Sequence, residues 1–284
     1  HSSRTRPILA IFSPSETPVT ASFATRTSKP RLPVTKRLKL IACEILYREF
    51  CAAVARSTSR VDVEFLPKGL HDLGAAGMHS RIAASLAEVD ESRYDAIVMG
   101  YALCSNGLVG LTARRVPLIV PRAHDCITLF LGSKERYLQY FNEHPGAYFK
   151  TSGWIERGDD LEQLQSDSIQ QRSRMCHTYE ELVERYGEDN ARFLHEQFQQ
   201  MTHNYSRITY IAMGIEPDDR FERESRELAA ARGWRYEQLA GDMGLIQELV
   251  DGPWRDDAFL TVPPGHRVAA SFDDGILRAE PVCE

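Results

Sequence analysis

The chain has 284 residues, of which 43% are hydrophobic and 26% are charged, the composition of a globular protein with a buried core. Its net charge of -6 excludes the basic field that nucleic-acid binding needs, and no apolar run approaches the ~20 residues of a membrane helix. The 6 cysteines are spread over the whole length, unlike a disulfide-stapled secreted domain. We therefore expect a cytoplasmic protein, in which grouped thiols bind metals or perform chemistry.

Residues 1–37 differ in composition from the rest of the chain. They are rich in Ser, Thr and Pro and carry seven basic residues against one acid. Such a segment buries too little apolar surface to offset the entropy lost on ordering. We predict a disordered or non-native leader, and a transit peptide, which is also basic and poor in acids, stays an alternative.

The next part of the chain alternates between apolar strands and helical patterns. Strands are predicted at 38–43, 61–67, 95–100 and 117–121, and helices at 45–57 and 78–89. Alternation of this kind is typical of an α/β fold with a doubly wound, mostly parallel sheet. We predict a Rossmann-like domain over residues 38–158, with helices on both faces of its sheet.

The second half of the chain continues with helices and strands of similar length. The predicted elements are a helix at 133–144, a strand at 147–154, a polar helical insertion at 159–205, a strand at 207–214, a helix at 219–234, a strand at 236–241, a helix at 243–252 and a closing strand and turn at 256–268. Residues 159–284 are therefore predicted to hold a helical segment and a second, smaller α/β portion.

Three of the predicted strands each run into a loop that carries one cysteine, namely Cys43, Cys104 and Cys126. Open α/β sheets bind ligands just outside the carboxyl ends of their strands, so we predict that the three thiols form one metal site. Three thiolate ligands leave a coordination position open for substrate, either on zinc or on one iron of a [4Fe–4S] cluster. The alternative is that these cysteines only fill gaps in the core.

Polar residues stand next to the three cysteines in the sequence. We predict His124, Asp125 and Glu44 as proton-transfer residues or as supports for the metal ligands. Arg122 is predicted to clamp a carboxylate or phosphate of the substrate. The alternatives are a solvent-exposed histidine for His124 and a surface ion pair for Arg122.

Two glycine-containing loops predict contacts to an anion. Ser105, Asn106 and Gly107 precede one predicted helix, and Gly132 and Ser133 precede another. The N-terminal amides of both helices would face an anionic group of the substrate. Neither loop matches the phosphate loop GxxxxGK[ST] or the dinucleotide fingerprint GxGxxG, so no nucleotide cofactor is predicted.

Several long motifs resemble an uncharacterised prokaryotic family that is known only as a domain of unknown function. These motifs are IACEILYREF, VEFLPKGLHDLG, YDAIVMGYALCSNGLVGL, PRAHDCITLFLGSKERYLQYF and TSGW, and the resemblance covers about residues 38–279. It implies a cytoplasmic protein that is often encoded beside corrinoid-dependent methyltransferases, and it brings no established reaction. The strand-end cysteines are also similar to those of quinolinate synthase, in which three cysteines hold a cluster with one open iron.

The sequence thus predicts a metal-dependent enzyme that acts on a small anionic or thiol-containing molecule. Zinc is the first choice because the chain has no CxxC run and His124 is available for a mixed shell; a [4Fe–4S] cluster is the second. One alternative is a non-catalytic metal- or corrinoid-related accessory protein whose partner is a methyltransferase. Another is an enzyme with Cys126 as nucleophile and His124 as its base. An oligomer is compatible with each of these hypotheses.

Overall fold

The computed structural model describes residues 35–104, 106–157 and 205–282, together with the isolated residues 183, 188 and 192. The chain divides into two compact units, His1–Val34 and Thr35–Glu284, and the fold below is that of the second unit. Most of the predicted leader, and nearly all of the predicted insertion at 159–205, lie outside the described residues. Among the residues that are described, no helix combines the length and the apolar character needed to cross a bilayer.

A five-stranded sheet forms the centre of this unit. Its strand order is β2-β1-β3-β4-β8, in which the first four strands are parallel and the last is antiparallel to its neighbour. The strands are β1 (Arg37–Cys43), β2 (Arg60–Leu66), β3 (Ala96–Gly100), β4 (Leu118–Pro121) and β8 (Phe259–Val262). Every residue of β3 and β4 is buried, because helices or other strands cover both faces of these central strands. Their sequences are therefore continuously apolar and do not alternate with polar residues.

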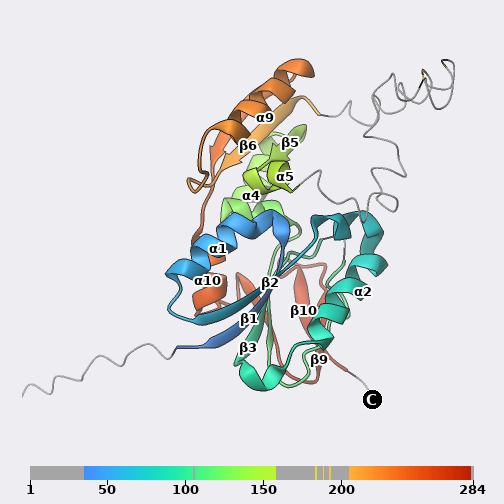
Figure 1. Cartoon of the computed structure of the whole chain (residues 1–284). Coiled ribbons are helices and arrows are strands. Elements are labelled where there is room, and N and C mark those ends of the chain that lie inside the picture. The colour runs from blue at the N-terminus through green and yellow to red at the C-terminus, as the bar shows by residue number, and fades with distance from the viewer. Residues whose placement is uncertain are drawn as a thin grey trace, which may run out of the picture. The chain divides into compact units, whose positions relative to one another are not determined.

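Helices cover this sheet from two sides. Helices α1 (Tyr47–Arg56) and α10 (Gly244–Asp251) lie on one side, and α2 (Gly74–Ala87) lies on the other (Figure 1). The chain passes from β1 to β2 and then returns to β3 on the opposite side of β1, so the strand order reverses between β1 and β3. Ligands of open α/β sheets bind at such a reversal, beyond the carboxyl ends of the strands.

A second, three-stranded parallel sheet has the order β5-β6-β7, and a hairpin of β9 and β10 follows near the end of the chain. The strands are β5 (Ala147–Lys150), β6 (Arg207–Ala212), β7 (Arg235–Ala240), β9 (His266–Ala270) and β10 (Leu277–Pro281). The remaining helices are α3 (Cys126–Leu131), α4 (Lys134–Glu143), α5 (Ser152–Glu156) and α9 (Arg220–Ala231). Both sheets contain strands from either side of residue 158, where the sequence predicted a domain boundary. In the second sheet β5 pairs with β6, and in the first sheet β8 pairs with β4.

The predicted α/β class is confirmed, and two predicted elements are wrong. No helix follows Gly107, because residues 108–116 form turns and an isolated bridge from Thr112 to Arg267. The strand predicted at 147–154 ends at Lys150, and the last residues of that segment form α5 instead. Thr151 causes the change, because its hydroxyl accepts a hydrogen bond from the Trp154 amide (3.2 Å) and so caps a helix.

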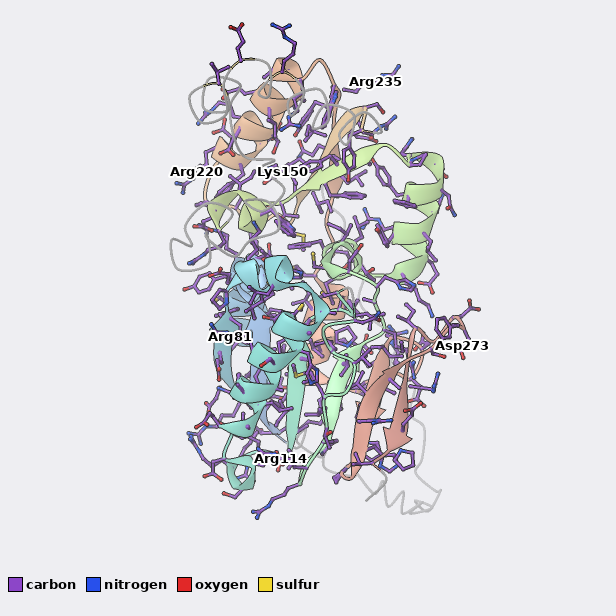
Figure 2. The ribbon with its side chains drawn as sticks, turned by 90° about the vertical axis from the view of Figure 1, so that its right-hand side faces the viewer. Arg81, Arg114, Lys150, Arg220, Arg235 and Asp273 are labelled. Carbon is purple, nitrogen blue, oxygen red and sulfur yellow. The ribbon has the colours of Figure 1, made fainter. Side chains whose placement is uncertain are left out.

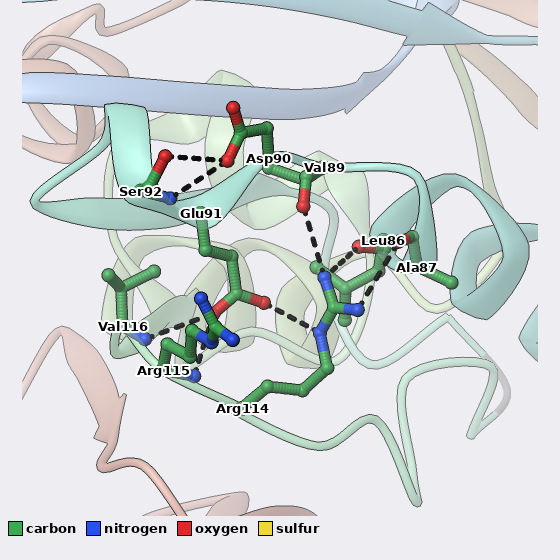
Figure 3. A network of polar contacts seen from close by, with 9 residues as sticks. All are labelled: Leu86, Ala87, Val89, Asp90, Glu91, Ser92, Arg114, Arg115 and Val116. Atoms are coloured by element: carbon green, nitrogen blue, oxygen red, sulfur yellow. Dashed lines mark hydrogen bonds and ion pairs between the residues drawn. The ribbon is translucent and has the colours of Figure 1, made fainter.

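The buried carboxylate of Glu91, which forms an ion pair with the partly exposed Arg114, fastens the amino ends of β3 and β4 (Figure 3). Glu91 accepts hydrogen bonds from the Arg114 guanidinium (2.7 Å) and from the amides of Arg115 (2.7 Å) and Val116 (3.1 Å). The same guanidinium donates to carbonyls in and just after the last turn of α2. Figure 2 shows Arg114 toward one end of the molecule and Lys150, the last residue of β5, well away from it.

Candidate functional site

The three cysteines follow the carboxyl ends of β1, β3 and β4. Cys43 is the last residue of β1, and Cys126 is the first residue of α3. Cys104 lies in the loop after β3, and its amide donates a hydrogen bond to the His124 carbonyl (3.0 Å). A second backbone bond joins Leu103 to Ala123 (2.9 Å), so the loops that follow β3 and β4 run side by side.

All three cysteines are free thiols and all three are buried, with exposed fractions of 2% for Cys43, 8% for Cys104 and 7% for Cys126. Their charges act on one another. A thiolate at Cys43 raises the pKa of Cys104, and thiolates at Cys104 and Cys43 raise the pKa of Cys126. Each of these ionised thiols would therefore act on the ionisation of a neighbouring one, while the predicted common metal site stays a prediction.

Burial is the main influence on these thiols. It raises the pKa of Cys43 to about 12 and the pKa values of Cys104 and Cys126 further above the usual range. The thiols are consequently protonated near neutral pH when nothing else binds them. A metal ion that displaces the protons would supply the missing positive charge.

The positions of the possible ligands limit which metal ion or cluster could bind beside the thiols. In the part of the chain that the structure describes, no three His, Cys, Asp or Glu side chains lie close enough to hold a single metal ion. The thiols are thus near enough to influence each other's ionisation, yet they do not form a ready-made site for one ion.

The backbone at Cys104 adopts a conformation that L-residues rarely use. Its φ angle is 46°, and that of Asn106 is 71°. Strain of this kind costs ~1–3 kcal/mol and persists only where the surrounding structure imposes it, most often at functional sites. The next residue, Gly107, leaves no room for a side chain, because a Cβ there would lie 2.5 Å from the sulfur of Met78. Close packing against α2 therefore holds this loop in place.

A histidine that the sequence analysis did not select lies beside Cys43. The Nε2 atom of His71 is 3.7 Å from the Cys43 sulfur. His71 belongs to the short 3-10 segment η2 (Lys68–Leu73), which is tied to Glu44 by a hydrogen bond from the Lys68 amide (2.7 Å). Burial, assisted by the charge of Lys68, lowers the pKa of His71 to about 4, so the imidazole is neutral. Its position five residues after the end of β2 was the available signal, since the same strand-end rule selected the cysteines.

Trp154 reaches the site from the segment that follows β5. Burial raises the pKa of Cys126, whereas a hydrogen bond from the Trp154 side chain acts in the opposite direction. The Trp154 ring centre lies 6.3 Å from that of His71. Gly153 allows this approach, because a Cβ there would lie 1.7 Å from the Ile45 carbonyl oxygen. The second sheet therefore contributes a wall to a site whose thiols come from the first.

The hydroxyl groups of Tyr101, Thr128 and Ser152 are fully buried and have no hydrogen-bond partner among the described residues. Tyr101 directly follows β3, and its pKa is raised first by burial and then by the charges of Cys43 and Cys104. Buried hydroxyl groups almost always have partners, and each one without a partner needs an explanation. A ligand bound next to the thiols would provide it.

A family model described as "protein of unknown function (DUF1638)" matches residues 65–250, more than half of the chain. The chain belongs to the DUF1638 family. His71, Cys104 and Cys126 lie inside the matched range, and Cys43 precedes it. No curated protein and no solved structure matches the chain. The predicted membership in an uncharacterised family is confirmed, while the link to methyltransferases stays a prediction.

The polar residues predicted beside the cysteines of this DUF1638 protein mainly hold the site together. Asp125 caps α3 by accepting from the Ile127 amide (3.0 Å), and it also accepts from the Tyr137 hydroxyl (2.8 Å). Glu44 holds η2, as described above. The His124 side chain is exposed, and its backbone carbonyl rather than its ring contacts the Cys104 loop.

Among the predicted anion-binding residues that the structure describes, none forms a hydrogen bond with a thiol. Arg122 donates to the carbonyls of Asp256 (2.7 Å), Gly275 (2.6 Å) and Leu277. Ser133 caps α4 by accepting from the Arg136 amide (3.1 Å). Asn106 is exposed, Gly107 packs on α2, and Ser105 lies outside the described residues. Arg122 and Ser133 line a separate cavity of about 120 Å³, which none of the three cysteines lines.

Proposed function

We propose that this DUF1638 protein is a metal-dependent enzyme that binds a small molecule at a centre held by Cys43, Cys104 and Cys126. The proposal is supported by three free and buried thiols that follow the carboxyl ends of neighbouring strands and whose charges act on one another's ionisation. We also propose that the fold is doubly wound and Rossmann-like. The reversal of strand order between β1 and β3 supports that description and coincides with the position of the thiols.

A [4Fe–4S] cluster suits the described residues better than a single zinc ion does, because no three possible ligands among them converge on one point. A cluster is larger than one ion, so its cysteine ligands stand farther apart than the ligands of zinc. The three thiols influence one another, but no three possible ligands among the described residues converge on a single ion. The main argument for zinc was a mixed shell with His124, whose side chain is exposed. A cluster held by three cysteines has one iron without a protein ligand, and this iron would bind and polarise an oxygen or sulfur of the substrate.

The other side chains of the site would orient the substrate and adjust the centre. Hydrogen bonds to ligating sulfurs tune the reactivity of such centres, and the positions of His71 and Trp154 suit this role at Cys43 and Cys126. The unpartnered hydroxyl of Tyr101 would donate a hydrogen bond to a polar atom of the substrate. The low exposure of the thiols favours a substrate small enough to enter a nearly closed site.

The cysteine-nucleophile hypothesis is less well supported. It requires a thiolate at Cys126 and a base in contact with it. Burial and two neighbouring thiols act against ionisation of Cys126, and the predicted base, His124, is exposed. The accessory-protein hypothesis has no observation in its favour among the described residues.

The proposal is tested by measuring iron, sulfide and zinc in anaerobically purified protein, and by its visible absorption spectrum. We expect four irons and four sulfides per chain, lost in Cys43→Ser, Cys104→Ser and Cys126→Ser. The matched control is Cys51→Ser, because Cys51 is a free cysteine exposed on α1. Stoichiometric zinc that depends on the same three cysteines would retain the centre but reject the cluster. A metal-free protein after reconstitution, or metal content that is equal in all variants, would reject the centre itself.

A further inference from the structure

Glu49 is an acidic residue on the buried face of α1. It lies in the first turn of α1, it is 0% exposed, and among the described residues neither of its carboxyl oxygens has a hydrogen-bond partner on another residue. Its own backbone amide opposes the effect of burial on its pKa only in part. An ionised carboxylate in such a place is very costly, so the group stays neutral or the structure around it changes. Burial raises the pKa of Glu49 to about 7, the boundary of the physiological range.

The groups around Glu49 offer little to compensate a negative charge. The next residue, Arg48, donates twice to Glu156 of α5, each time at 2.7 Å. Glu216, in the loop after β6, is occupied by hydrogen bonds from the amides of Met213 (2.7 Å) and Ile215 (3.0 Å). The titratable and charged groups that act on Glu49 or respond to it are Arg48, Glu156, Glu216 and the Cys51 thiol. The one cation among them already serves another carboxylate.

These contacts form a junction between α1, α5 and the loop after β6, which we call the Glu49 junction and define by Arg48, Glu49, Glu156 and Glu216. It joins the two sheets, because α1 follows β1 of the first sheet, and α5 and the loop follow β5 and β6 of the second. Helix α5 also carries Trp154, the residue that hydrogen-bonds to Cys126. The same short helix thus connects Glu49 with the thiol site.

We infer that the Glu49 junction is a proton-operated clamp, which holds α5 and its Trp154 against the thiol site when Glu49 is protonated and releases them when Glu49 ionises. The ionised carboxylate repels Glu216 and Glu156 and competes with Glu156 for Arg48. Both effects weaken the Arg48–Glu156 bridge, which fastens α5 to α1. The clamp is therefore fully closed below about pH 4.5, where Glu49 is protonated in both states, and it loosens as the pH rises through about 7, which weakens the wall that Trp154 forms.

Hydrogen–deuterium exchange of the full-length protein tests this inference. The backbone amides of α5 in the wild type are compared with those in Glu49→Gln at the same pH, so that the intrinsic exchange rates cancel. We expect equal exchange at pH 4, where Glu49 is protonated whether α5 is held or released. At pH 8 we expect at least tenfold faster exchange in the wild type, because the pKa of Glu49 is about 7 in the closed state and returns toward the ordinary 4.5 when the carboxyl group is released. Glu88→Gln, at an exposed position after α2, is the matched control and should behave as the wild type.

A second variant keeps the test decisive if Glu49→Gln folds poorly. Glu216→Gln removes one repelling charge, so the pH at which α5 loosens should fall while the closed state at low pH stays the same. Equal exchange of α5 in the wild type and Glu49→Gln at pH 8 would overturn the inference. A pH response confined to α1 would also overturn it, because the clamp requires that α5 moves. The metal content enters neither comparison, so this test and the test of the centre can fail separately.

Discussion

The two ends of the five-stranded sheet are built on opposite principles. At the amino ends of β3 and β4, the buried carboxylate of Glu91 accepts three hydrogen bonds, from one guanidinium and two amides. At the carboxyl ends, three thiols carry raised pKa values, Cys104 has a strained backbone, and Tyr101 has a buried hydroxyl without a partner. One end satisfies every polar group of its network and serves stability. The other keeps groups unsatisfied, as sites that bind ligands do.

The largest loss of stability is expected from a substitution of Glu91 at the amino ends of β3 and β4. Glu91→Ala leaves two amides and a guanidinium without their charged acceptor, so we expect the free energy of unfolding to fall by roughly 3–5 kcal/mol. Urea denaturation followed by circular dichroism measures this change. Glu280→Gln is the control, because its ion pairs with Arg267 and Arg278 lie at the surface and such pairs contribute ~1 kcal/mol or less. Equal losses of unfolding free energy in the two variants would contradict the stabilising role of the Glu91 network.

The next largest effect on stability is expected at Glu49, and this effect depends on pH. Its pKa rises from an ordinary 4.5 to about 7 on folding, so the folded state binds the proton more tightly than the unfolded state. Stability is therefore full below pH 4.5 as far as this group is concerned, falls between pH 4.5 and about 7, and stays reduced above that range. The difference corresponds to about 3 kcal/mol. Glu49→Gln should remove this decline in urea titrations from pH 4 to 8; an unchanged slope would show that Glu49 is not the titrating group.

Gly153→Ala tests the contact between the two sheets at the thiol end. The added methyl group would overlap the Ile45 carbonyl, so α5 must shift, at a cost of roughly 2–3 kcal/mol. We also expect quenching or a shift of Trp154 fluorescence, since that ring leaves its place beside His71. Gly244→Ala at the start of α10 is the control, because its methyl group meets only the Asp242 side chain. A Gly153→Ala protein with wild-type stability and fluorescence would show that this contact is not tight.

The smallest effect on stability is expected at Cys104. Cys104→Gly relieves the positive φ, worth ~1–3 kcal/mol, while glycine adds ~0.5–1 kcal/mol of backbone entropy cost and a small buried side chain is lost. We therefore expect a change of less than about 1 kcal/mol in the metal-free protein, together with complete loss of metal binding. Urea denaturation and metal analysis of the same preparation check both halves. A loss of several kcal/mol would mean that Cys104 is a structural residue.

The sequence predicted the features that depend on local patterns. Apolar runs of four to seven residues identified β1, β3 and β4, and the strand-end rule identified the three cysteines as neighbours. The sequence could not show that Arg122 donates its hydrogen bonds to backbone carbonyls 134 and 153 residues later in the chain, because such partners depend on tertiary packing. The same holds for Trp154, which the Gly153–Ile45 contact brings to the thiols from the other sheet. His71 was within reach of the strand-end rule, which was applied only to cysteines.

The most direct test of the metal centre is anomalous diffraction from crystals grown and frozen without oxygen, with data collected on both sides of the iron and zinc absorption edges. We predict one compact iron signal within bonding distance of the sulfur atoms of Cys43, Cys104 and Cys126. The absence of any metal signal between these three sulfurs, or a metal bound entirely by other residues, would contradict the proposed function.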